Sequence, residues 1–510
     1  MRNESRTIRS VYNIICGIIF KVVGMFFPFL IKTIIIHKIG VEYLGLNSLF
    51  ASILNVLSLS ELGISGALVF KMYKPIAEND IARVNMLLKI YRDIYRIIGV
   101  VIAVLGLLIM PFLNYFISGD YPQDVNIYIL YDIYLLNSVL SYFLFAYKKS
   151  ILEAHQLNGD NSILETFTTL LMYIFQIITL LLFSNYYIYV LIMPISTIVL
   201  NLVRCIYVDK KFPEYKCEGN VDKEIIKELY LKVKALIGHK IGNTVITSAD
   251  SIIISAILGL NVLAIYSNYY LIISSIVGLI TIFYTSITAS VGNQIVSDST
   301  ENIKKNFYIL NFINSWIVGW STICLICLFQ PFMMLWMGKE LMFEFEVIVL
   351  FGIYFYSWLI RRIGLTYKDA AGMWEDDFWK PYIGIIVNII ANIILCKCIG
   401  VSGAIISTIF VMIVIYFPWE TKIVFSKILK CNSQGYYKKI IYYSVINCML
   451  IILTYIVCSL IKDVSITGLI IKFIICLIIP NSIYLCVYRN LNEFKELVKK
   501  FPLNKILKNR

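Results

Sequence analysis

The stretch IIIHKIGVEYLGLNS, residues 34–48, decides the fold because a second copy of it follows later in the chain. Residues 253–267 read IISAILGLNVLAIYS, and an ungapped shift of 219 residues places Gly40 on Gly259. Each copy is an apolar run, a short turn at the glycine and a second apolar run. The chain is therefore expected to contain an internal structural repeat.

Apolar runs long enough to cross a bilayer fill the chain around both copies. The 510 residues are 59% apolar and 15% charged, with a mean hydropathy of +0.79, unlike an ordinary soluble domain. A spanning helix needs about 20 apolar residues, whereas a barrel strand needs only about 9–11. The runs predict an all-α integral membrane protein with about fourteen spans: 11–36, 43–70, 94–117, 125–147, 163–183, 186–208, 235–258, 262–289, 307–330, 346–367, 379–397, 399–419, 439–461 and 465–488.

The repeat and the spans together predict two pseudo-symmetric lobes of six helices each, plus two C-terminal helices. Because six spans separate the copies, both keep the same orientation in the membrane. The linker and the tail have apolar residues at helical spacing beside basic ones, which is typical of helices lying on a membrane surface. We predict an N-terminal lobe (1–208), a cytoplasmic amphipathic linker (209–234), a C-terminal lobe (235–430), two extra spans (431–488) and a basic cytoplasmic amphipathic tail (489–510).

Positive charge is distributed unevenly between the connections. The chain has 45 Lys and Arg residues against 32 Asp and Glu, a net charge of +13. When the connections are assigned alternately to two sides, almost all cationic residues fall on the side of the N-terminus, which is the positive-inside pattern. The pattern predicts an even number of spans with both termini in the cytoplasm. Attraction to anionic lipid headgroups accounts for the charge without a nucleic-acid partner.

Short motifs along the chain carry a family resemblance. In order, they are KVVG from Lys21, ELGI from Glu61, YKP from Tyr73, ADSIIIS from Ala249, YSNYY from Tyr266, TYKDAAG from Thr366, KP from Lys380 and GVSGA from Gly400. Their order and spacing, over essentially the whole length, resemble the polysaccharide (Wzx-type) flippases of the multidrug/oligosaccharidyl-lipid/polysaccharide (MOP) exporter superfamily. The resemblance implies fourteen spans, a bacterial plasma membrane location and transfer of undecaprenyl-diphosphate-linked oligosaccharide from the inner to the outer leaflet by alternating access of two lobes.

The resemblance also implies partners. They are the polyprenyl-diphosphate-linked oligosaccharide, membrane lipids and, as candidates, a polysaccharide polymerase and glycosyltransferases. The chain has no phosphate-binding loop for ATP, and its lone histidines lack metal-ligand spacing. We expect no cofactor, no metal and no enzymatic activity. Coupling to H⁺ or Na⁺, the membrane potential or consumption of the product would drive transfer.

Three alternatives remain open from the sequence. A multidrug extruder of the same superfamily would capture cationic drugs with carboxylates, and a lipid II flippase would use the same chemistry as an oligosaccharide flippase. An integral-membrane polysaccharide polymerase is disfavoured because such enzymes need a sizeable outer domain, and the longest outer connection here has about 15 residues. The glycan, the resting conformation and the oligomeric state stay open.

Cationic residues inside spans are the first candidate site, because an intramembrane charge is costly enough to suggest a function. Lys21 and Lys240 coincide under the repeat, and each lies about 28 Å below its glycine turn at 1.5 Å per residue. They could hold a diphosphate entering from the inner leaflet, or they could simply extend to the inner interface. Arg361 or Arg362, at the inner end of the tenth span, could join them, although a positive-inside flank is the alternative.

Further candidates concern gating and the glycan. Lys32 and Asp250 occupy neighbouring repeat positions in the outer half of their spans, and the hypothesis is that they pair to close an outer gate. The alternative is that each pairs locally or is solvated. Glu61 comes level with Lys21 and could serve as a coupling site. Polar residues that could contact the glycan are Asn243, Thr244, Thr247, Asn268 and Tyr269, although such residues also hold helices together.

Overall fold

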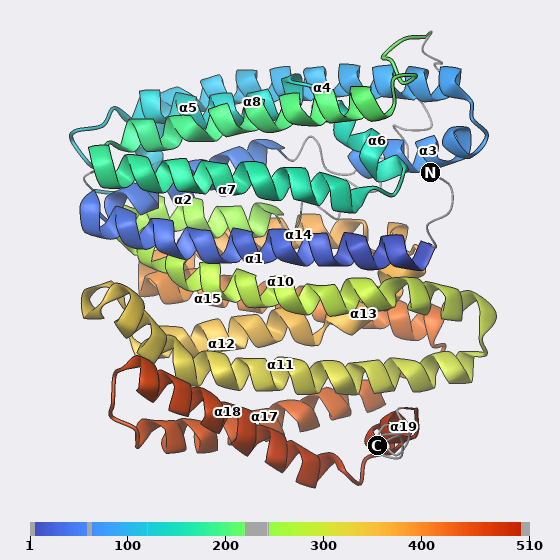
Figure 1. Cartoon of the computed structure of the whole chain (residues 1–510). Helices are drawn as coiled ribbons and strands as arrows, with labels where there is room; N and C mark the ends of the chain where they lie inside the picture. Colours follow the sequence, from blue (N-terminus) through green and yellow to red (C-terminus); the bar gives the residue numbers. More distant parts are fainter. Residues whose placement is uncertain (1–5, 59–63, 120, 220–241, 243, 501–510) are drawn as a thin grey trace. The chain divides into compact units, whose positions relative to one another are not determined.

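The computed structural model describes residues 6–58, 64–119, 121–219, 242 and 244–500 (Figure 1). Every regular element in these ranges is a helix, which confirms the predicted all-α class. These residues form two compact units, Met1–Ser267 and Asn268–Arg510. The boundary falls inside helix α10 (Leu260–Ser297) rather than in the linker 209–234, of which residues 220–234 lie outside the described ranges. The division into lobes of six spans stays a prediction.

The first unit is a bundle of long helices joined by short turns. Asn126 and Asn185 accept hydrogen bonds from the first backbone N–H groups of two of these helices and so fix where they begin. The elements are α1 (Arg6–Lys38), α2 (Glu42–Leu57), α3 (Ile64–Ala77), α4 (Ile81–Ile109), η2 (Met110–Phe116), α5 (Ile127–Phe143), η3 (Ala146–Lys148), α6 (Lys149–Ala154), α7 (Asn158–Phe183), α8 (Tyr186–Lys211) and the short helix Thr244–Leu258.

The second unit contains the rest of the chain. Its helices are the C-terminal part of α10, then α11 (Thr300–Met337), η4 (Lys339–Leu341), α12 (Phe345–Ile360), α13 (Arg362–Ala370), η5 (Glu375–Asp377), α14 (Trp379–Ile399), α15 (Val401–Phe410), η6 (Val411–Tyr416), α16 (Phe417–Ile423), η7 (Val424–Ile428), α17 (Gln434–Ser459), α18 (Ile466–Tyr488) and α19 (Asn492–Lys500). Both η6 and η7 are π-helical, so α16 lies between two wide turns.

Eleven described helices are long and apolar enough to cross a membrane, and the bent pair Ile127–Phe143 with Ala146–Ala154 can make a twelfth. The chain is a multi-pass membrane protein. The predicted spans 43–70 and 235–258 each include residues outside the described ranges. The count of fourteen therefore stays a prediction.

Connections that were predicted to share a side of the membrane lie together in the first unit. At one end, Tyr186 Oη donates to Tyr43 O at 3.0 Å and the Asn126 N–H donates to Tyr187 Oη at 2.5 Å. At the other end, where the connections rich in Lys and Arg lie, Lys89 Nζ donates to Gly219 O at 2.9 Å. The turns around residues 43, 126 and 187 therefore meet at one end, as the alternating assignment requires.

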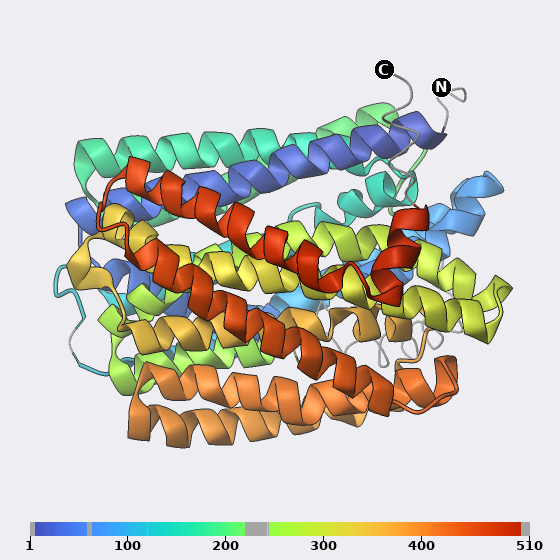
Figure 2. The same ribbon diagram turned by 90° about the horizontal axis from the view of Figure 1, so that it is seen from below.

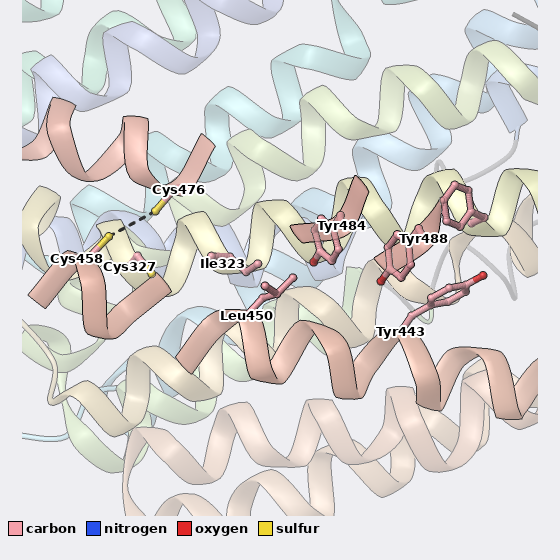
Figure 3. Packing of buried hydrophobic residues seen from close by; sticks show 9 residues of the cluster. Ile323, Cys327, Tyr443, Leu450, Cys458, Cys476, Tyr484 and Tyr488 are labelled. Atoms are coloured by element: carbon pink, nitrogen blue, oxygen red, sulfur yellow. Dashed lines mark hydrogen bonds between the residues drawn. The ribbon is translucent and has the colours of Figure 1, made fainter. Parts of the chain in front are cut away.

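Helix α11 lies at the centre of the C-terminal part of the second unit. It packs against α12, α17, α18 and α19, as two views of the chain show (Figures 1 and 2). The buried cluster that joins α11, α17 and α18 contains Phe312, Ile323, Cys327, Tyr443, Leu450, Cys458, Cys476, Tyr484 and Tyr488 (Figure 3).

The tail helix α19 contacts other helices of the second unit. Phe494 and Leu497 pack against the buried cluster of α11, α17 and α18, and the predicted place of the tail at the membrane surface stays a prediction. Ion pairs hold the polar side: Lys439 pairs with Glu493, and Lys305 Nζ lies 2.8 Å from Glu496 Oε2. The hydrogen bond from Lys305 lowers the pKa of Glu496.

Candidate transport site

The two repeated turns meet in the first unit. Gly45 on α2 faces the start of α10 so closely that a Cβ atom there would lie 2.4 Å from Leu260 O. Gly259 has a φ of +89°, and its Cβ atom would lie 2.7 Å from Ser118 O. Only glycine fits both positions, because a side chain would collide with backbone. We call the contacts of Gly45 with Leu260 and of Gly259 with Ser118 the turn junction.

Lys32 provides a polar contact near the turn junction. Its ammonium donates to Ser267 O at 3.2 Å and to Ser267 Oγ at 3.3 Å, which ties α1 to the first turns of α10. Asp250 is buried, with 1% of its surface exposed, on the helix Thr244–Leu258. The Lys32–Asp250 pair stays a prediction, and the contact of Lys32 with Ser267 was not anticipated from the sequence.

A cavity of about 770 Å³ opens beside the turn junction. Its polar lining includes Glu42, Gln123, Asp124 and Asn261, and Tyr43 Oη donates to Asp124 Oδ1 at 2.5 Å. None of the lining residues in the described ranges is Lys or Arg. This lining suits hydroxyl groups better than a diphosphate, because the carboxylates of Glu42 and Asp124 would repel an anion that no cation in the lining attracts.

The predicted diphosphate residues fall in different surroundings. Lys21 is exposed on α1. Lys240, Glu61 and Asn243 lie outside the described residues. Arg362 is half-buried, with its guanidinium carbon 5.7 Å from the centre of the Tyr284 ring.

The predicted glycan residues are largely engaged within the protein. Thr247 Oγ1 donates to Thr244 O at 3.2 Å within its own helix. Asn268 and Tyr269 are both 0% exposed. Tyr269 Oη donates to Gln330 Oε1 at 3.3 Å and accepts from the Phe343 N–H at 3.3 Å. Neither Asn268 nor Tyr269 offers surface in this conformation, and their contact with the glycan stays a prediction.

Arg361 is the central residue of a buried ion-pair network in the second unit. Helix α12 ends at Ile360 and α13 begins at Arg362, so Arg361 lies at a break. Asn314 Nδ2 donates to Leu359 O at 3.0 Å and satisfies a carbonyl near this break. Arg361 Nη1 donates to Glu420 Oε1 at 2.6 Å, and both side chains are at most 5% exposed. A diphosphate bound to Arg361 would therefore have to compete with Glu420.

Further buried charges extend this network. Lys380 Nζ lies 2.7 Å from Glu420 Oε1 and 2.6 Å from Asp377 Oδ2, and Lys368 Nζ lies 2.8 Å from the same Asp377 oxygen. The Tyr416 ring lies 5.3 Å from both the Arg361 guanidinium carbon and Lys380 Nζ. We call Arg361, Lys368, Asp377, Lys380 and Glu420 the second-unit network.

The first unit has a corresponding arrangement. A helix break also occurs here, between α5 and η3, where Phe145 has a φ of +53°. Lys148, at this break, pairs with Asp209 on α8. Arg204 Nη2 lies 2.9 Å from Glu165 Oε1 nearby. In each unit, a buried cation at a helix break therefore pairs with a carboxylate on a later helix: Lys148 with Asp209 on α8, and Arg361 with Glu420 on α16.

Sequence reasoning missed the partners in both networks. Lys148 and Asp209 are 61 residues apart, and Arg361 and Glu420 are 59 apart. One sequence feature could have revealed the second-unit network. Glu420 is an acidic residue near an apolar run, and a charge in such a place is expected to have a partner.

A family model described as "Polysaccharide biosynthesis protein" matches residues 10–290. No curated protein sequence matches the chain.

Solved structures show the same fold. A lipid II flippase, MurJ, in an inward closed conformation is similar, with a TM-score of 0.63 and 17% identity over 94% of this chain and 99% of that one. A multidrug resistance MATE family transporter of the MOP superfamily is similar in its inward-facing form (TM-score 0.58, 13% identity, 78% of this chain and 94% of that one). Its outward-facing form has a TM-score of 0.57 and 14% identity over 83% of this chain and 97% of that one. At these identities the likeness concerns the fold alone.

Proposed function

Because the chain belongs to the polysaccharide biosynthesis protein family, we propose that it flips lipid-linked oligosaccharide repeat units from the inner to the outer leaflet of the bacterial plasma membrane. The family match over residues 10–290 is the observation that carries this proposal. A fold similar to those of a flippase and a transporter supports movement of a substrate rather than catalysis. The substrate would be an undecaprenyl-diphosphate-linked oligosaccharide, with its polyprenyl tail kept in membrane lipid.

The diphosphate would bind to cations reached from the cytoplasmic leaflet. Lys21 supports this role because its side chain is exposed on α1. Lys240, its repeat counterpart, is proposed as the matching group. A lysine acts on phosphate as a point charge, so two matched lysines could grip the headgroup without fixing its orientation. Arg361 is a weaker candidate because Glu420 already neutralises it.

The turn junction suggests how the outer side closes. Lys32 bound to Ser267 and Gly45 against Leu260 hold the two repeated turns together. For substrate to leave outward, these contacts would have to separate. Asp250 would then be the partner toward which Lys32 moves, and Glu61 would be a site where H⁺ or Na⁺ couples to this exchange.

A complementation experiment tests the proposal. Surface polysaccharide is measured in a strain that lacks the gene and carries the wild-type chain, Lys21→Ala or Lys240→Ala. Losing a charge-assisted hydrogen bond costs about 1.5–3 kcal/mol, so each variant should reduce transport about ten-fold or more. Lys38→Ala is the matched control, because Lys38 is an exposed lysine on the same helix.

The other outcomes separate the alternatives. Unchanged polymer with new drug sensitivity in the deletion strain would indicate a multidrug extruder. Defective peptidoglycan with normal capsule or exopolysaccharide would indicate a lipid II flippase. A double-mutant cycle of Lys32→Met and Asp250→Asn tests the gate, and additive effects of the two changes on transport would exclude the proposed pairing.

A further inference from the structure

Three buried cysteines on three helices bring their sulfur atoms together in the second unit (Figure 3). Cys327 lies on α11, Cys458 on α17 and Cys476 on α18, and each is at most 3% exposed. Their Sγ atoms all lie within 4.8 Å of one another, and 3.9 Å separates those of Cys458 and Cys476. In the described part of the chain, no other His, Cys, Asp and Glu side chains gather in this way.

This spacing matches the geometry of a metal held by three thiolates. Zinc–sulfur bonds are about 2.3 Å long, so sulfurs bound to one tetrahedral ion lie about 3.8 Å apart. The Cys458–Cys476 separation of 3.9 Å is close to this value. Only small side-chain movements would be needed to place all three sulfurs on one ion.

A buried lysine lies beside the cysteines and could balance the negative charge of a metal bound by three thiolates. Lys472 is 8% exposed on α18 and lines a cavity of about 230 Å³ together with Cys327 and Cys458. Within the described ranges, no carboxylate forms an ion pair with its ammonium. An ammonium inside a span is costly without a countercharge. A divalent ion with three thiolates has a net charge of −1, which Lys472 would neutralise.

The same cavity offers a route for a soft cation. Met334 and Met342 line it, and thioethers are soft ligands suited to thiophilic metals. Gln330 also lines it, but its amide is engaged with Tyr269 and the Phe343 carbonyl. A water molecule from the cavity would therefore be the fourth ligand of a tetrahedral ion.

We propose that Cys327, Cys458 and Cys476 bind a divalent thiophilic cation of the Zn²⁺ class, with Lys472 as the countercharge. The three thiols release three protons to solvent as the metal–sulfur bonds form, and nothing is oxidised or reduced. The ion fastens the two C-terminal spans α17 and α18 to α11. This site is independent of the proposed transport function.

Metal binding to the purified full-length chain tests the proposal. The protein is incubated in detergent with Zn²⁺, passed over a desalting column and analysed for metal by mass spectrometry. We expect one equivalent of Zn²⁺, falling to none in Cys458→Ala or Cys476→Ala. With Cd²⁺ as the probe, thiolate-to-metal charge-transfer absorption should appear in the near ultraviolet and vanish in the same variants. Loss of Lys472, as Lys472→Met, should weaken binding about 10- to 100-fold.

Matched controls are available on the same helices. Cys448 on α17 and Cys486 on α18 are exposed, so Cys448→Ala and Cys486→Ala should keep the full equivalent. Thermal unfolding with and without Zn²⁺ shows whether each variant folds, and only the wild type and the controls should be stabilised by the metal. Three free thiols without bound metal would overturn the proposal. A Cys458–Cys476 disulfide, or metal retained in Cys458→Ala, would overturn it as well.

Discussion

Each unit stabilises a helix break, α5 to η3 in the first and α12 to α13 in the second, with the same type of contact but at different depths. In the first unit, Lys148 is buried while the side chain of its partner Asp209 is 49% exposed. In the second unit, the side chains of Arg361 and Glu420 are 5% and 2% exposed, and Lys380 binds the same carboxylate. Water can replace part of a lost interaction in the first unit but not in the second.

Because the two ion pairs differ in exposure, losing them should cost different amounts of folding free energy. Exposed ion pairs contribute about 0–1 kcal/mol, whereas removing one partner of a buried pair costs about 3–5 kcal/mol, because a charge is left without compensation. The second-unit network should therefore hold α16 rigidly between its two flanking π-helical segments. The first-unit pair should permit easier movement at the corresponding place.

The largest effect is expected from Glu420→Gln. It leaves Arg361 and Lys380 buried without their shared carboxylate, which should lower the free energy of unfolding by about 3–5 kcal/mol. Denaturation in mixed detergent micelles measures this change. A loss below about 1 kcal/mol would show that water reaches the network, and the contrast between the units would fail.

Gly384→Ala perturbs the second-unit network without removing a charge. A Cβ atom at this position would lie 2.4 Å from Tyr416 Oη, and the Tyr416 ring lies beside Arg361 and Lys380. Overpacking of this kind costs about 1–3 kcal/mol. Gly364→Ala is the control, because nothing lies within 4 Å of a Cβ atom there. Equal melting temperatures for the two variants would contradict the packing argument.

Asp209→Asn makes the corresponding change in the first unit. Asp209 is half exposed, so solvent can approach Lys148 once the carboxylate is gone. We expect a loss of about 1 kcal/mol by the same denaturation measurement. A loss as large as that of Glu420→Gln would mean that exposure does not distinguish the units.

The smallest effect is expected from Asp376→Asn, which breaks an ion pair at the surface of the second unit. Its partner Lys427 has a side chain that is 52% exposed. The free energy of unfolding should change by less than about 1 kcal/mol, and added salt should remove the difference. A larger change that persists in high salt would place this pair in the buried network.

Local features of the fold could be predicted from the sequence because they depend on neighbouring residues. The apolar runs predicted the helices, and the repeat identified Gly40 and Gly259 as turns, both of which have positive φ. Long-range partners could not be predicted in this way. The contact of Gly45 with Leu260 and the pair of Arg361 with Glu420 depend on how distant helices pack.

For the candidate site, too, the sequence could identify residues but not their long-range partners. Intramembrane charge singled out Lys32 and Arg361 as candidates, but hydropathy gives no partner, so their contacts with Ser267 and Glu420 emerged only from the structure. The burial of Asn268 and Tyr269 could not be read from the sequence either. Polar side chains in a span can face a pathway or another helix, and sequence alone does not distinguish these cases.

The leaflet position of the lipid-linked oligosaccharide tests the central claim most directly. Intact cells that lack the gene are treated with periodate, a membrane-impermeant oxidant of vicinal diols, and the lipid-linked oligosaccharide is extracted and analysed. If the chain is a flippase, the intermediate accumulates protected from periodate, and re-expression of the wild-type chain makes it accessible. An intermediate that is already oxidised without the chain would contradict the account, because transfer across the membrane would then need another protein.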